Sequence, residues 1–198
     1  MRTLFNDYKN VKDFLQIRVF DSNLHPEYFA NRVCSRDWLP LCAYFAIPLR
    51  VVDDKVVNVV ITDELIRGWS VDEYILYKDA MKNAMTQGPA IRSLYEDDIL
   101  EMLCISAFNY EFGSSYILNP KVRKEMGGNY IIIPSSIHEL IAVKDVEDLD
   151  MIPGMYDMVR ETNANPDLIT EGDILSNKLF WCSRDGRFIE ELKEHYGR

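Results

Sequence analysis

The sequence predicts an α+β fold with a mixed, mainly antiparallel sheet and helices packed on it. Three observations lead to this class. Apolar and β-branched runs come in neighbouring pairs joined by short turns, which indicates strands that pair locally. Segments with apolar residues at steps of three and four lie between these pairs and indicate helices. Strands and helices do not alternate regularly, as they would in a doubly wound parallel sheet.

The first part of the chain supplies two predicted helices and one strand pair. Residues 5–20 carry apolar side chains at helical spacing, and Pro26 can open a second, short helix. Residues 41–52 and 56–62 have the composition of two strands joined by a tight turn. Pro48 cannot donate to a strand ladder, so we expect it at a sheet edge or a bulge.

A capping box begins the next predicted helix. In Ser70-Val71-Asp72-Glu73 the serine oxygen can accept the Glu73 amide while the glutamate reaches back. We therefore expect a helix over residues 71–87 that Gly88-Pro89 ends. The other predicted elements are a helical stretch at 95–98, a strand pair at 102–110 and 115–118, a basic helix at 121–126, a hairpin at 130–133 and 137–143, a helix at 152–162, a strand at 179–182 and a polar helix at the C-terminus.

The chain is expected to form one domain spanning residues 1–198. A length of 198 residues with 47% apolar and 27% charged residues suits one medium domain with a sizeable core. The sequence contains no internal repeat, low-complexity tract or linker composition. A weak seam is expected near residues 88–89, where a Gly-Pro pair follows the predicted helix.

Cysteine usage and hydropathy indicate a cytoplasmic protein without a membrane partner. The four cysteines are scattered with no C-x-x-C pair, which favours buried, reduced thiols over disulfides. The first residues become acidic before an apolar leader segment can develop. No stretch approaches the roughly 20 apolar residues that a membrane-spanning helix needs.

Negative charge is concentrated in one part of the chain. The formal net charge is −10, and residues 144–175 contain nine acidic side chains against Lys144 and Arg160. Such a surface repels a phosphate backbone, which disfavours direct nucleic-acid binding and favours a protein partner with a basic surface. The alternative is that the excess acid only keeps the protein soluble. The candidate partner-binding residues are Asp145, Glu147, Asp148, Asp150, Asp157 and Glu161.

The candidate catalytic residues are Ser135, Ser136, His138 and Glu139, in a loop after the predicted strand at 130–133. A serine nucleophile needs a base within hydrogen-bond reach, and the base needs an orienting acceptor. His138 and Glu139 are sequence neighbours, so they cannot form that orienting pair directly. A G-x-S-x-G elbow is also missing. We expect the serines to cap a turn, and the alternative is a small serine hydrolase or esterase that uses Ser135 or Ser136 with His138.

Metal and cofactor sites are not expected. His25, His138 and His195 show neither H-E-x-x-H nor H-x-H spacing. No G-x-x-x-x-G-K pattern provides a phosphate loop. Carboxylate pairs such as Asp53-Asp54 are common, but most should be solvated.

Aromatic and methionine side chains recur on the predicted helix at 71–87. Tyr74, Tyr77 and Met81 follow one another at helical spacing. Core packing is the first interpretation of this pattern, and a partner-binding face is the second.

Four blocks resemble a family of unknown function that is widespread in gut clostridia and often encoded near mobile genetic elements. The most specific is Pro134-Ser135-Ser136-Ile137-His138-Glu139, within Tyr130–Ile141. The other blocks are Phe5–Asp13, Ile61–Trp69 and Met158–Asn163. Leu175-Ser176-Asn177 departs from the Leu-Ser-Asp triplet expected there. The resemblance implies a single fold and a cellular setting, and it carries no activity.

These observations predict a non-enzymatic, acidic, protein-binding accessory factor. A mobile element would use it to modulate or inhibit a host nucleic-acid-handling or defence complex, because an acidic face can occupy a basic channel by mimicking phosphate charge. The serine hydrolase or esterase is the first alternative, and a homo-oligomeric scaffold is another.

Overall fold

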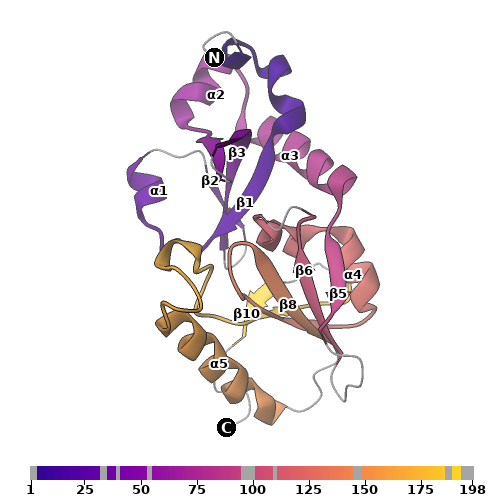
Figure 1. The fold of residues 1–198 in the computed structure, drawn as a ribbon. Helices are drawn as coiled ribbons and strands as arrows, with labels where there is room; N and C mark the ends of the chain where they lie inside the picture. Colours follow the sequence, from indigo (N-terminus) through magenta and orange to yellow (C-terminus); the bar gives the residue numbers. More distant parts are fainter. Residues whose placement is uncertain are drawn as a thin grey trace. The chain divides into compact units, whose positions relative to one another are not determined.

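The chain forms two compact units, residues 1–87 and 88–198, each built on its own antiparallel sheet (Figure 1). The computed structural model describes residues 4–31, 35–38, 41–52, 55–94, 101–108, 111–144, 149–185 and 189–192. All described strand pairs are antiparallel, and helices accompany both sheets, which confirms the predicted α+β class. The boundary between the units falls beside the predicted seam at residues 88–89.

The first unit is organised around one long strand, β3 (Leu41–Val52). β1 (Gln16–Phe20) and β2 (Ser35–Trp38) both pair with its first half and so lie on opposite edges of it. β4 (Lys55–Val60) pairs with its second half, on the same edge as β2 because β1 and β4 share Ala46 as a partner. The register shifts between Pro48 and Arg50, which agrees with the prediction of a sheet edge or a bulge at Pro48.

Both faces of this sheet are covered by apolar side chains. Phe20, Cys42, Tyr44 and Ala46 form a cluster on one face, and Tyr28 stacks on Tyr44 with ring centroids 4.8 Å apart. Tyr28 comes from α1 (Glu27–Ala30), the short helix predicted after Pro26. The alternate residues of β3 point to the other face, as strand geometry requires. α3 (Glu73–Gln87) packs there beside β1 (Figure 1).

Two predictions for this unit are wrong. Residues 5–20 were expected to be one helix, but they form three 3-10 turns, Leu4–Asn6, Tyr8–Asn10 and Lys12–Phe14, followed by β1. The capping box is also wrong: Ser70 ends α2 (Asp63–Trp69) in a left-handed conformation with φ 54°. The side chain of Asp72 accepts the Ile75 amide at 2.8 Å and so caps α3 instead.

The second unit has a six-stranded sheet in the order β10-β9-β7-β8-β6-β5. The predicted hairpin at its centre is confirmed as β7 (Tyr130–Ile133) and β8 (Glu139–Lys144). α5 (Ile152–Ala164) covers one face through Ile152, Met155 and Val159. The remaining elements are β5 (Ala90–Ser93), β6 (Met102–Ser106), α4 (Pro120–Met126), β9 (Phe180–Cys182), β10 (Ile189–Glu191) and the 3-10 segments Gly113–Leu118, Leu149–Met151 and Glu171–Asp173.

Two further predictions are wrong in this unit, and one lies outside the described residues. Residues 115–118 were expected to be a strand, but they belong to the 3-10 segment Gly113–Leu118, and β6 pairs with β5 and β8 instead. Residues 189–191 form a strand where a terminal helix was expected. The helical stretch predicted at 95–98 is outside the described residues. Within the described part of the chain, no helix is long and apolar enough to cross a membrane.

Candidate functional site

The predicted catalytic candidates lie on the turn that joins β7 to β8. The hydroxyl oxygen of Ser136 accepts the backbone amides of His138, at 3.0 Å, and Glu139, at 3.2 Å. The Ser136 amide donates to the carbonyl of Glu139 at 3.1 Å. Ser136 therefore closes the turn with its side chain, which is a common role for a serine that follows a strand.

His138 is held by two partners from distant parts of the sequence. Its Nδ1 accepts the backbone amide of Phe112 at 3.3 Å, and the Phe112 ring packs against the imidazole with centroids 5.3 Å apart. Because Nδ1 accepts an amide proton, the ring proton of neutral His138 resides on Nε2. Nε2 lies 3.3 Å from Oδ1 of Asp173. The other carboxylate oxygen of Asp173 accepts the Thr170 hydroxyl at 2.7 Å.

Main-chain hydrogen bonds fix the same turn from both sides. Gly113 donates its amide to the carbonyl of His138 at 2.9 Å, and Ser114 donates to Ile137 at 3.3 Å. Ile137 in turn donates to the carbonyl of Asp173 at 2.9 Å. The turn is thus bonded to the start of the 3-10 segment Gly113–Leu118 and to the 3-10 turn Glu171–Asp173.

The Glu139 carboxylate lies close to three other polar side chains near the turn. Its Oε1 accepts the Ser135 hydroxyl at 3.2 Å, and its Oε2 accepts the Cys104 thiol at 3.4 Å. Arg92 Nη2 lies 3.8 Å from Oε2. Burial raises the pKa of the Cys104 thiol, Arg92 acts in the opposite direction, and the Glu139 carboxylate adds to the rise. The thiol is therefore protonated near neutral pH and is a poor nucleophile.

The four catalytic candidates lie on one turn, but they do not form a pair of serine nucleophile and histidine base. Among these four residues, all of them described, the structure pairs Ser135 with Glu139 and places no serine hydroxyl on the imidazole. Both imidazole nitrogens already face other partners. The described residues also contain no group of three or more His, Cys, Asp or Glu side chains that could hold a metal ion.

Three of the six predicted partner-binding acids are described, and all three are exposed: Asp150, Asp157 and Glu161. Asp157 and Glu161 lie one turn apart on α5, on the side opposite its buried residues. Arg160 contacts Asp157 at 3.4 Å and lies over the Tyr156 ring. The other three acids, Asp145, Glu147 and Asp148, lie outside the described residues.

The sequence did not predict a groove on α3. Core packing was the first interpretation of the tyrosines and methionine on this helix, but Tyr74 is 68% exposed, so for Tyr74 that interpretation is wrong. Tyr74, Tyr77, Met81 and Met85 line a surface groove of about 490 Å³ together with Lys78, Lys82 and Thr86. A signal was present in the sequence, because Lys78 and Lys82 lie one helical turn apart beside the same apolar residues.

Comparison with known proteins supports a family resemblance for one segment of the chain. Residues 92–184 match a family of unknown function (DUF5688). The chain matches no curated protein and no solved structure. The matched segment begins in β5, ends shortly after β9, and includes the β7–β8 turn, its partners Phe112 and Asp173, and α5. The segment that carries the Pro134–Glu139 block is therefore similar to an uncharacterised family, as the sequence predicted.

Proposed function

We propose that the protein is a non-enzymatic, protein-binding accessory factor whose acidic α5 face contacts a basic surface on a protein partner. The observation that supports this most directly is the exposure of Asp150, Asp157 and Glu161 at and along α5. The net charge of −10 gives the whole chain a field that attracts basic partners and repels nucleic acid.

The buried side of α5 makes this face a rigid one. Ile152 is fully buried, Val159 is 3% exposed, and both belong to the same core cluster as strands β7 and β8. The Tyr156 hydroxyl donates to the carbonyl of Leu192 and fixes the helix further. Asp157 and Glu161 are thereby held at a constant spacing that a basic surface can match. Charge complementarity of this kind mainly sets partner choice and association rate.

The partner we propose is a host nucleic-acid-handling or defence complex, which the protein inhibits on behalf of a mobile element. The support is the acidic face itself, since regularly spaced carboxylates can occupy a basic channel in place of phosphates. The family setting inferred from the sequence blocks points the same way. Such binding would weaken steeply with added salt, because exposed charges are screened over a few ångströms at high ionic strength.

The test reverses two charges on the α5 face. D157K/E161K and wild type are used as baits for affinity capture from a bacterial lysate at low salt, with recovered proteins quantified by mass spectrometry. The expected result is enrichment of basic nucleic-acid-handling proteins by wild type, lost in D157K/E161K and at about 0.5 M salt. D13K/E125K is the matched control, because Asp13 and Glu125 are also exposed and the net charge changes equally.

Equal recovery with D157K/E161K and D13K/E125K would contradict the proposal, because net charge alone would then explain the capture. Recovery of nucleic acid in place of basic proteins would contradict it as well.

The hydrolase alternative has one favourable contact, the hydrogen bond between His138 Nε2 and Asp173, since a catalytic imidazole needs an orienting carboxylate. The other nitrogen accepts the Phe112 amide, so a serine could reach the imidazole only after that bond is broken. A serine-reactive fluorophosphonate probe distinguishes the two functions. The accessory factor should not be labelled, whereas labelling that H138A abolishes would establish the hydrolase.

A further inference from the structure

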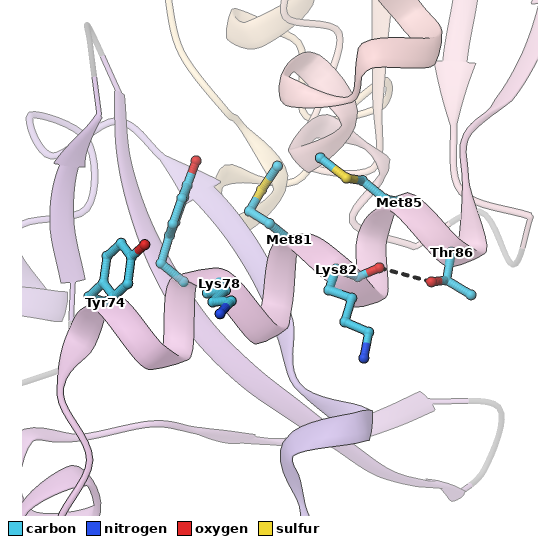
Figure 2. A pocket seen from close by; sticks show the side chains of 7 residues that line it. Tyr74, Lys78, Met81, Lys82, Met85 and Thr86 are labelled. Carbon is cyan, nitrogen blue, oxygen red and sulfur yellow. Dashed lines mark hydrogen bonds between the residues drawn. The ribbon is translucent and has the colours of Figure 1, made fainter.

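The side of α3 that faces away from the core of the first unit carries an apolar stripe, and two of its side chains are largely exposed to solvent. The stripe consists of Tyr74, Tyr77, Met81 and Met85, which follow one another at steps of three and four residues. Figure 2 shows the two methionine side chains extending to the same side of the helix, in line with Tyr74. Tyr74 is 68% exposed and Met85 is 46% exposed.

The opposite side of the same helix packs in the core of the first unit. Leu76 and Ala80 are fully buried. Asp79 accepts the Tyr8 hydroxyl at 2.8 Å, and the Asn83 amide group donates to the carbonyls of Lys12 and Leu15. These contacts orient α3 and hold the helix against the segment that precedes β1. The exposed side chains of Tyr74 and Met85 lie outside these contacts.

Two lysines flank the stripe along one edge. Lys78 and Lys82 are exposed, lie one turn apart, and line the same groove of about 490 Å³. In Figure 2 the Lys82 side chain extends away from the methionines, and the Thr86 hydroxyl is bonded to the Lys82 carbonyl at 2.9 Å. The groove thus has an apolar floor and a positive edge, in a chain whose net charge is −10.

We propose that this groove docks an amphipathic, acidic helix from a protein partner. An apolar stripe at helical spacing is the usual receptor for the apolar face of another helix, and flexible methionines adapt to its side chains. The positive edge selects carboxylates beside that face. A second copy of α3 fits less well, because it would bring the same two lysines to the contact.

This surface is independent of the proposed function of α5. It lies in the first unit, outside residues 92–184, and its charge is opposite in sign to that of the α5 face. D157K/E161K therefore leaves it intact, and failure of one proposal does not decide the other.

The test uses two matched fluorescent peptides and the full chain. Both peptides are amphipathic helices with leucine at i, i+3, i+4 and i+7, flanked in one by glutamate and in the other by lysine. Fluorescence anisotropy at low salt should show tighter binding of the glutamate peptide, by about tenfold. Long-range attraction to a chain of charge −10 favours the lysine peptide, so the opposite preference has to arise at a local positive surface.

Two variants locate the binding on α3. K78E/K82E should remove the preference for the glutamate peptide. M81Q/M85Q should weaken the binding of the glutamate peptide by about tenfold. K9E/K124E is the control, because Lys9 and Lys124 are exposed lysines elsewhere and the net charge changes equally. Unchanged melting temperatures establish that the variants remain folded.

Several outcomes would overturn the proposal. Tighter binding of the lysine peptide, no binding of the glutamate peptide, or equal effects of K78E/K82E and K9E/K124E would each do so. Light scattering that shows a wild-type dimer lost in M81Q/M85Q would assign the groove to a second copy of this chain instead.

Discussion

Gly113 lies so close to neighbouring backbone that no side chain fits there. A Cβ atom at this position would overlap the carbonyl oxygen of His138 and lie 2.6 Å from the Ala107 nitrogen and from the Ser106 Cα. All three atoms belong to the backbone and cannot turn aside. The close approach lets the Gly113 amide donate to the carbonyl of His138 and so positions the β7–β8 turn.

Gly113→Ala is therefore expected to lower the free energy of unfolding by about 1–3 kcal/mol, the usual cost of overpacking. Urea unfolding followed by circular dichroism measures it. Gly154→Ala is the matched control, because no atom lies within 4 Å of its Cβ position and it sits on α5. Alanine should there be neutral or stabilising by up to about 1 kcal/mol. Equal effects of the two substitutions would contradict the close approach.

Cys182 should make stability depend on pH in the alkaline range. Burial raises the pKa of its thiol from 9.0 to about 12, against smaller opposing effects of Tyr130 and Arg123. Below pH 9 the thiol is protonated in both states. Between pH 9 and 12 the unfolded chain loses a proton that the folded chain keeps, so stability falls as pH rises.

The slope from this one group is at most about 1.4 kcal/mol per pH unit. Cys182→Ala should therefore show a shallower decline than wild type across this window in urea titrations at successive pH values. Cys182 also adds to the rise in the pKa of Tyr130, so its removal reduces the contribution of that tyrosine in the same direction, whereas Tyr8 and Tyr44 contribute to both proteins and cancel. Parallel declines would show that the Cys182 thiol ionises normally in the folded protein.

At the scale of elements, the junction between α2 and α3 shows how one serine can be misassigned. Ser70 and Glu73 have capping-box spacing, yet Ser70 adopts the left-handed conformation that ends α2, and its amide donates to the Arg67 carbonyl. A sequence pattern for a helix start cannot distinguish a serine that ends α2 from one that begins α3, because α2 ends only four residues before α3 begins. The adjacent Asp72 then provides the cap.

Two substitutions separate the two assignments. Ser70→Gly should stabilise the protein by about 0.5–1 kcal/mol, because glycine adopts φ 54° without the Cβ penalty. Asp72→Ala should destabilise it by about 1 kcal/mol through loss of the cap. Thermal unfolding of both variants and of wild type measures these changes in stability. If Ser70 capped α3, Ser70→Gly would not stabilise, and Asp72→Ala would have little effect.

Elements that pair with their sequence neighbours were predictable, and those that depend on distant contacts were not. The strands of the pairs β3–β4 and β7–β8 follow each other closely in the sequence, so composition and turn-forming residues sufficed to predict them. Residues 16–20 carry apolar side chains that also fit a helix, but pairing with residues 42–46 makes them a strand buried on both faces. Residues 115–118 lose strand structure because β6 takes β5 and β8 as partners.

In the candidate site, too, the local contacts were predictable from the sequence and the distant contacts were not. The sequence indicated a polar turn at 134–139, and Ser136 closes that turn locally. The partners of His138 come from Phe112 and Asp173, which are 26 and 35 residues away. No local pattern relates such residues, so the sequence could not predict the tautomer or the engagement of both imidazole nitrogens.

At the scale of the whole molecule, the division into two compact units makes the prediction of a single domain testable. Each unit has its own sheet and buried side chains, with Leu76 fully buried in the first and Ile132 in the second. Leu76→Ala and Ile132→Ala should each cost about 2–5 kcal/mol. If residues 1–198 form one domain, both variants lower the temperature of the same single calorimetric transition. If two transitions appear and each variant shifts a different one, the seam beside Gly88 is a domain boundary and the prediction is wrong.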